Sequence, residues 1–242
     1  MFGSSTVRLF AWEGTTERPK RPGWKLPNVV ERVLDRVAHL MLAQPRVEPT
    51  LILRLQKYKR LEAVPTPVKQ AAQAAAVLAG SLVEPQGRLL RTPVSRVESD
   101  TALLGGGIRF HSRSLVRLLQ GATEAYLFLL TLGPRLETRA RELMAEEQFL
   151  EGLLLDTAGW VAVDALAKTL RAQLSVEAKA EGMRLTHRMA PGYSDWRLEE
   201  QRLLFSAFGE EALPIQLTEA CVMLPQKSIS GIYGLIPSTS AL

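Results

Sequence analysis

The sequence predicts an α+β fold, in which a bent, mainly antiparallel sheet packs against helices. Glu124–Leu132 reads EAYLFLLTL, an almost uninterrupted apolar run that is typical of a strand in the centre of a sheet. Gln148–Ala180 has helical spacing, with a stripe of small and medium residues that allows another element to approach closely. Strand-like runs stand both before and after this helix, so we expect the helices to cover a sheet.

The first third of the chain is expected to be mainly helical. Asn28 can cap a helix that has an apolar stripe and ends near Pro45. Leu51–Arg54 is a short apolar run that fits either a helix or a strand. Val68–Ala79 is rich in alanine, the strongest helix former, and the prolines of segment 65–67 stand where a helix tolerates a missing N–H.

The middle of the chain has two strand-like runs, Arg88–Val97 and Gly107–His111, beside three consecutive glycines at 105–107. The glycines lack the lysine and the spacing of phosphate-binding loops, so a turn or bulge is favoured over a phosphate cradle. Ser112 is expected to start a short helix that runs through Leu119.

The last part of the chain mixes both kinds of element. Gly133-Pro134 should end the central strand and open a helix, and Gly209 is placed to stop an amphipathic helix. The remaining expected elements are helices at 135–145 and 198–208 and strands at 184–189, 215–218 and 228–236.

Length and composition indicate one soluble domain. A chain of 242 residues can bury a core without disulfides or metal. The single cysteine, Cys221, excludes an internal disulfide and a multi-cysteine zinc site, and we expect it to pack in the core. There is no run of eighteen apolar residues, and Met1–Trp12 lacks the apolar run of a secretory signal. We therefore expect a cytoplasmic protein that contacts no membrane.

The net charge of +5 is concentrated near the start of the chain, where residues 1–60 hold 12 Lys/Arg against 5 Asp/Glu. A basic segment can neutralise phosphates, but no helix-turn-helix, zinc-finger or RNA-binding signature accompanies it, so nucleic acid is not the expected partner. Residues 18–25 are rich in proline and cations, as a solvated tail is. We therefore expect residues 1–27 to be a basic, flexible tail and residues 28–242 to form the domain.

The segment from Arg188 to Gly231 holds the most unusual combination of residues in the chain. Pro191-Gly192 is a strong turn signal, because proline fixes φ and glycine adds backbone freedom. The flanking Arg188 can fork onto a carboxylate, and Tyr193 can donate a hydrogen bond or stack. This turn suits an amino-acid-like ligand, while an ordinary surface turn with an exposed arginine is the alternative.

The same segment follows the pattern RxAPGY…LTExxxMxPxxSxSG, which resembles the activation domain of cobalamin-dependent methionine synthase. The pattern fixes about a dozen positions, which is far more specific than a lone glycine motif. The resemblance extends more weakly upstream to about Leu51. Full-length enzymes of that family usually continue with Pro-Ala-Cys-Pro, whereas this chain has Ser194-Asp195-Trp196, as do smaller, separately encoded relatives that work beside a methionine synthase without its own copy.

The resemblance implies a bound S-adenosylmethionine. Arg188 would clamp the methionine carboxylate, and the turn after it would line the ligand. The family places an acidic residue of the long helix near the sulfonium, although a carboxylate in mid-helix is commonly only solvent-facing. An acidic residue of the LTE sequence would either contact the ligand or brace the turn. The implied ligand contacts are Arg188, Ala190, Pro191, Gly192, Tyr193, Asp164 and Glu219.

The resemblance also implies a rescue reaction. When cobalt has drifted to inactive Co(II), a flavodoxin- or ferredoxin-like donor supplies one electron, and the resulting Co(I) takes a methyl group from S-adenosylmethionine. The chain has no Asp-x-His-x-x-Gly sequence, by which cobalamin domains present a histidine to cobalt. The cobalamin is therefore expected on a partner, a methionine synthase or related corrinoid protein, and this chain would be one component of a methyltransferase.

The alternative function is a noncatalytic interaction or scaffold protein for a corrinoid methyltransferase, which has lost S-adenosylmethionine binding. Other catalytic classes lack support. His39, His111 and His187 are too scattered for a metal site, and His187 beside Arg188 is more simply a structural or exposed residue than an acid or base. There is no Ser-His-Asp order and no nucleophile elbow.

Overall fold

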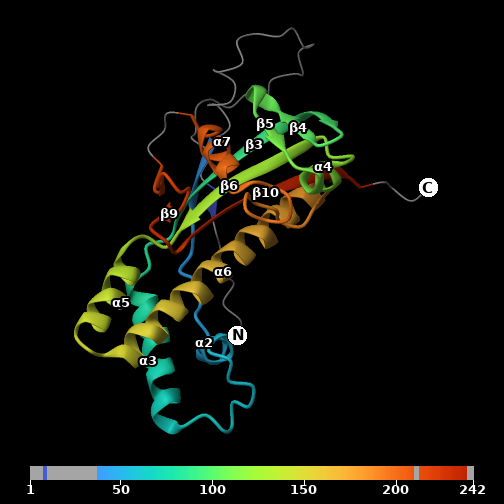
Figure 1. Ribbon diagram of the computed structural model, residues 1–242. Coiled ribbons are helices and arrows are strands. Elements are labelled where there is room, and N and C mark those ends of the chain that lie inside the picture. Colours follow the sequence, from blue (N-terminus) through green and yellow to red (C-terminus); the bar gives the residue numbers. More distant parts are fainter. Residues whose placement is uncertain (1–7, 10–36, 210–212, 239–242) are drawn as a thin grey trace.

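One antiparallel sheet forms the centre of the computed structural model, which describes residues 8–9, 37–209 and 213–238. Figure 1 shows the sheet at one end of the molecule and a group of helices at the other. The expected α+β class with a mainly antiparallel sheet is confirmed, because all the paired strands run antiparallel. The main path runs in the order β1 (Arg8–Leu9), β2 (Val37–Met41), β3 (Gln86–Glu98), β6 (Glu124–Thr131), β10 (Ser228–Pro237) and β7 (Met183–Leu185).

β6 lies in the middle of the sheet, as its apolar run predicts, and pairs with β3 on one side and β10 on the other. Its side chains alternate between two cores, because successive residues of a strand point to opposite faces. Tyr126, Phe128 and Leu130 belong to the core under the helices. Leu127 and Leu129 belong to the core on the opposite face. The strand is therefore buried on both sides.

β3 bends the sheet. Its first part pairs with β2 and β6, and its last part pairs with β4 (Thr101–Leu104) after a register shift between Val94 and Arg96. Such a shift bends and twists a strand locally. A hairpin follows, in which the three glycines form a short 3-10 turn, η1 (Gly105–Gly107), before β5 (Arg109–His111). Gly106 and Gly107 have φ of 74° and 75°, so the glycines serve a tight turn, as favoured from the sequence.

Four helices build an arm that extends from one face of the sheet. α6 (Phe149–Ala180) is 32 residues long and runs from the sheet to the other three helices (Figure 1). These are α2 (Pro49–Leu55), α3 (Thr66–Leu82) and α5 (Arg135–Ala145). The small residues of α6 are buried against these helices, and Ala72, Ala75, Ala76 and Ala79 of α3 are buried in the same core.

The opposite face of the sheet is covered by shorter elements. α4 (Arg113–Leu119) begins at Ser112, whose side chain accepts a hydrogen bond from Leu115 N at 3.0 Å. η2 (Leu198–Glu200) and α7 (Gln201–Ser206) together replace the single helix expected at 198–208. A small separate ribbon, β8 (Gln216–Leu217) with β9 (Met223–Leu224), lies beside them.

The prediction of a helix from Asn28 to about Pro45 is wrong for residues 37–45, which are the part of this segment that the structure describes. Residues 28–36 lie outside the described residues, and Val37–Met41 forms strand β2, with Val37 opposite Leu90 and Leu40 opposite Gly87. A short stretch such as VAHLM fits a helical stripe as well as a strand, and pairing with the edge of β3 decides between them.

Two further expectations are modified. The strand expected at 184–189 is shorter: β7 ends at Leu185, and Met189 makes an isolated bridge with Ile232 of β10. Of the expected tail 1–27, the structure describes only Arg8–Leu9, which pair with β2. Among the described helices, none is long and apolar enough to cross a membrane.

Candidate functional site

The Arg188–Tyr193 turn is attached to β10 through Arg188. Its Nη1 donates to the carbonyl oxygen of Ser230 at 2.9 Å, and its Nη2 donates to the hydroxyl of Tyr193 at 3.0 Å. The guanidinium also lies 5.2 Å from the centre of the Tyr193 ring, within cation–π range. A guanidinium has five N–H donors, so these two bonds leave others for a ligand carboxylate.

Gly231 makes this attachment possible. A Cβ at this position would lie 2.9 Å from Arg188 Cγ and 3.0 Å from the carbonyl oxygen of Met189. Only glycine lets the turn cross β10 at this distance. The final glycine of the sequence pattern is thus explained by close packing between the turn and the strand.

Backbone hydrogen bonds also link residues within the turn. Gly192 has a φ of 89°, and its N–H donates to the carbonyl oxygen of Trp196 at 2.8 Å. Tyr193 N donates to the carbonyl oxygen of Ala190 at 3.1 Å. These bonds leave the Tyr193 side chain exposed above the turn, next to Arg188.

The Ser194-Asp195-Trp196 sequence anchors the turn to the rest of the fold. Asp195 accepts hydrogen bonds from Ser112 Oγ at 2.8 Å, Arg113 N at 2.8 Å and Ser114 N at 3.1 Å. Bonds from Ser114 and Ser112 hold the pKa of Asp195 well below its usual range. The carboxylate therefore ties the turn to the start of α4 at neutral pH.

Trp196 provides the second anchor. It is buried, packs edge-on against Phe110 of β5 with ring centres 5.0 Å apart, and donates from Nε1 to Glu200 at 2.8 Å. Glu200 also accepts from the backbone N of His111 at 2.9 Å. Asp195 and Trp196 thus hold the turn in place, and neither side chain lines the cavity described next.

A cavity of about 550 Å³ lies beside the turn, which is a size typical of small-molecule sites. Of the residues expected at the ligand, Arg188, Ala190, Pro191, Tyr193 and Asp164 line it. Its walls come from α6, the turn, η2, α7, β9 and β10. The other lining residues are Trp160, Val163, Leu198, Gln201, Cys221, Val222, Met223, Gln226, Ser228, Ile229 and Ser230.

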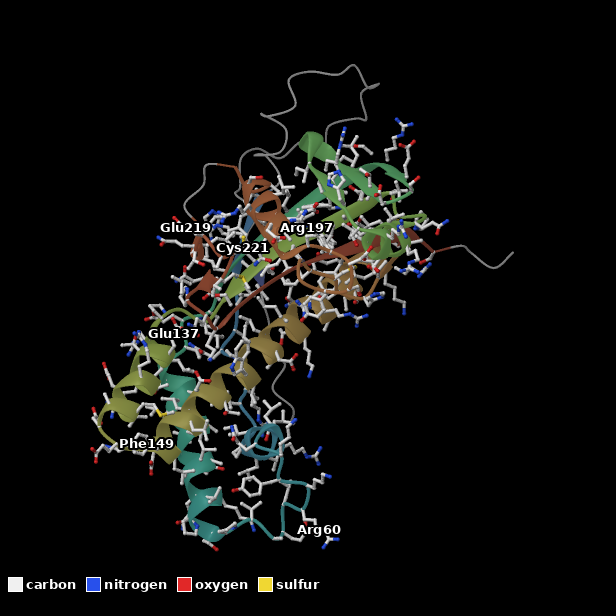
Figure 2. All side chains as sticks on the ribbon, viewed as in Figure 1. Arg60, Glu137, Phe149, Arg197, Glu219 and Cys221 are labelled. Atoms are coloured by element: carbon white, nitrogen blue, oxygen red, sulfur yellow. The ribbon has the colours of Figure 1, made fainter. Side chains whose placement is uncertain are left out.

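Gly192 and Glu219 are not among the lining residues. Gly192 faces Leu198, since a Cβ there would lie 3.4 Å from Leu198 Cδ1. Glu219 lies in the turn between β8 and β9, where its side chain is exposed and its carbonyl oxygen accepts a bond from Arg202. Figure 2 shows Glu219 close to Cys221 at the sheet end of the molecule. Cys221 is buried, as expected, and it also lines the cavity.

Asp164 lies at the edge of the cavity on α6 and forms an ion pair with Lys168 at 2.6 Å. Its side chain is 61% exposed, as is common for a carboxylate in the middle of a helix. Asp164 nevertheless lines the cavity.

Sequence reasoning missed three neighbouring residues, of which two lie on α6. Lys227 precedes β10, and its side chain is only 2% exposed. Its Nζ lies 2.6 Å from Asp156 Oδ1 and 4.4 Å from the centre of the Trp160 ring. Spacing along the helix would put Asp156 and Trp160 on one face, but nothing in the sequence indicates that Lys227 is buried against them.

A second cavity of about 680 Å³ adjoins the first, and Trp160 and Asp164 line both. It lies between α2 and α6. Its apolar wall includes Leu51, Leu55 and Leu153, which are all substantially exposed. In the part of the chain that the structure describes, no group of His, Cys, Asp and Glu side chains could hold a metal ion.

No protein-family model and no curated protein matches the sequence. Among solved structures, the chain is similar to the crystal structure of the MetH reactivation domain bound to AdoHcy, with a TM-score of 0.58 and 14% sequence identity. The match covers 85% of this chain and 80% of that chain. At this identity the similarity shows a shared fold, and it agrees with the mixed helix and antiparallel sheet architecture described above.

Proposed function

We propose that this chain binds S-adenosylmethionine in the 550 Å³ cavity and serves as a stand-alone reactivation module for a separate cobalamin-dependent methionine synthase. One observation carries the proposal. The cavity gathers Arg188, Ala190, Pro191 and Tyr193 from the turn and Asp164 from α6, residues far apart in the sequence that the resemblance had put at the ligand. The structural neighbour is a reactivation domain that binds AdoHcy, which supports the same class of ligand here.

The charged groups of S-adenosylmethionine suit the two charged residues that line the cavity, Arg188 and Asp164. Arg188 is held by Ser230 and Tyr193 and would direct its remaining N–H groups at the carboxylate of the methionine part. Asp164, which lines the same cavity, would attract the amino group or the positive sulfonium. A methionine part held by both residues presents its methyl group in a defined direction, so positioning would supply the catalysis.

The proposed reaction balances without any acid or base from this chain. The S–CH₃ bond breaks with its electron pair retained by sulfur, which leaves the neutral thioether. The electron pair of Co(I) forms the new bond to the methyl carbon. The electron that converts Co(II) to Co(I) comes from a flavodoxin- or ferredoxin-like protein, and the corrinoid is held by the partner.

The corrinoid protein would cover the exposed apolar wall of the second cavity. Leu51 and Leu55 of α2 and Leu153 and Trp160 of α6 are 41–53% exposed and line one cavity together. Such contiguous exposed apolar groups commonly mark interaction sites. This wall adjoins the proposed ligand site, so a partner docked there would bring its acceptor to the methyl donor.

Two measurements test the proposed function. Titration calorimetry of AdoHcy into the purified chain should show saturable binding with one site. A corrinoid protein reduced to Co(I) should then accept the labelled methyl group of S-adenosylmethionine only when this chain is present. If AdoHcy does not bind while a corrinoid protein does, the chain is a scaffold and the proposed function is wrong.

A further inference from the structure

We infer that Trp160 is the platform on which the purine base of the adenosyl ligand stacks, and that Lys227 and Asp156 are positioning residues for its indole. The inference rests on the proposed function, because it assigns the adenine end of the same ligand. It adds a residue that neither the sequence pattern nor the structural neighbour identifies.

Trp160 is placed as a ligand-binding aromatic residue is. It lies on α6, four residues before Asp164, and is 49% exposed although it is one of the largest apolar side chains. Its indole lines both cavities. A tryptophan in a protein core would be covered, so the packing of the fold does not explain this position.

The indole is held by a buried cation. Lys227 Nζ lies 4.4 Å from the ring centre and bonds to Asp156 Oδ1 at 2.6 Å, while the lysine side chain is 2% exposed. Burying an ammonium is unfavourable unless it is paired, and an ion pair with a partner as exposed as Asp156, at 43%, contributes little to stability by itself. The pair is better explained by what it fixes, which is the orientation of Trp160.

Gly159 makes room for this arrangement. A Cβ at residue 159 would lie 2.8 Å from Lys227 Cε and 2.8 Å from Leu136 Cδ2. The lysine stem therefore passes across α6 where the helix has no side chain. The missing side chain at Gly159 is what lets the Lys227 ammonium reach the face of the Trp160 ring.

The buried cation also determines which ligand group suits the ring. The ammonium already interacts with the negative face of the indole, so a second cation on the ring is disfavoured. A sulfonium would therefore avoid the face of the indole, although it can lie beside Asp164, whereas a neutral planar base can stack on the ring. With the carboxylate at Arg188, the adenine is left for the Trp160 end of the cavity.

Three probes separate the ends of the ligand: AdoHcy, adenosine and L-methionine, each titrated by calorimetry. Trp160→Leu should weaken binding of AdoHcy and adenosine roughly 5- to 150-fold, which corresponds to about 1–3 kcal/mol for a base stacked on an aromatic side chain. L-Methionine should bind as before. Trp160→Phe should retain most of the affinity, since it keeps an aromatic face.

Phe149→Leu is the matched control, because Phe149 is an exposed aromatic residue of the same helix that lines neither cavity. Figure 2 shows it at the far end of the helical arm, away from Cys221. This variant should leave the affinity for all three probes unchanged.

The positioning role is tested by a double-mutant cycle. Lys227→Met should reduce AdoHcy and adenosine affinity several-fold when Trp160 is present, and should have no further effect in the Trp160→Leu background. If Lys227→Met does not fold, Asp156→Asn replaces it in the cycle, because Asp156 is 43% exposed and its amide is the same size.

Equal AdoHcy affinity in Trp160→Leu and the original protein would overturn this inference and leave the proposed function standing. Equal losses for adenosine and L-methionine would overturn it too, because they would show a general collapse of the cavity. Additive effects in the cycle would remove the positioning role of Lys227. Failure of the original protein to bind AdoHcy would overturn both the proposed function and the inference.

Discussion

The Arg188 side chain both holds the turn in the fold and faces the 550 Å³ cavity. Its guanidinium joins the turn to Ser230 of β10 and to Tyr193, and it also lines the 550 Å³ cavity. A residue with both roles should affect stability and affinity together, whereas a pure ligand contact should affect affinity alone. Its substitutions can therefore separate the two contributions.

Arg188→Ala should weaken binding of S-adenosylmethionine by about 2–4 kcal/mol, or roughly thirty- to thousandfold, because it removes a charge-assisted, forked pair. Arg188→Lys should restore only part of this, since lysine keeps the charge and loses the planar fork. Calorimetry measures both. Thermal melts without ligand should show a lower Tm for Arg188→Ala, because two internal hydrogen bonds are lost as well.

Tyr193→Phe is the control for that experiment. It removes the hydroxyl that accepts from Arg188 at 3.0 Å and leaves both the guanidinium and the ring. Its affinity should fall much less than that of Arg188→Ala. If Arg188→Ala binds as tightly as the original protein, the carboxylate lies elsewhere.

Asp195 should make the stability of the protein depend on pH. Its pKa is lowered in the folded protein, so its contribution is fully present above the usual carboxyl pKa of about 3.9 and is lost as the pH falls below that value. Asp195→Asn should therefore melt at a lower temperature than the original protein at pH 5–8. The difference should shrink below about pH 4, because the Asp195 carboxyl takes up a proton there in the unfolded chain while it stays ionised in the folded protein. A difference that stays constant down to pH 3 would mean that the hydrogen bonds, and not the charge, provide the stability.

At the scale of elements, β10 connects the sheet to the site. It pairs with β6 and β7, and its Gly231 passes under Arg188. Gly231→Ala should cost about 1–3 kcal/mol of stability, because the added methyl group meets a backbone oxygen and must displace the turn. Ligand affinity should fall with it. Chemical denaturation and calorimetry measure the two effects.

Gly80→Ala is the matched control for this substitution. Gly80 lies in α3, and a Cβ there would meet nothing within 4 Å. This variant should gain about 0.5–1 kcal/mol, because alanine is the better helix former. A similar loss in both variants would show that the tight packing around Gly231 is not the cause.

The elements with long, consistent patterns could be predicted from the sequence. α5 has the expected bounds, α6 begins one residue later than expected, and β6 is the central strand. β2 could not be predicted, because five residues fit either period and pairing with β3 decides. Four of the five named turn residues line one cavity, and Gly192 does not. The burial of Lys227 could not be predicted from the sequence, because its charge would normally place it in solvent.

At the scale of the whole molecule, the helical arm and the sheet meet where the two cavities adjoin. α6 runs through both regions (Figure 1). Its Trp160 and Asp164 line both cavities. A partner that covers the α2–α6 wall would therefore face the proposed ligand directly. Contact there should be brief, because the same acceptor must also visit other methyl donors.

Leu55→Glu and Leu153→Glu should lower the rate of methyl transfer to a Co(I) corrinoid protein at least several-fold, because they place charges on the apolar wall. AdoHcy affinity should be unchanged, since neither residue lines the ligand cavity. Val176→Glu is the control: Val176 is 70% exposed on the same helix and lines neither cavity. Unchanged transfer in both leucine variants would mean that the partner docks on another face.

The place of β10 in the sheet has a consequence for the order in which the protein matures during synthesis. Residues 228–237 are translated after β6 and β7, yet they lie between these two strands and provide the carbonyl group that holds Arg188. A nascent chain that has not yet released this strand from the ribosome has an open edge on β6 and no completed site. The 550 Å³ cavity is therefore complete only in chains that have finished their sheet.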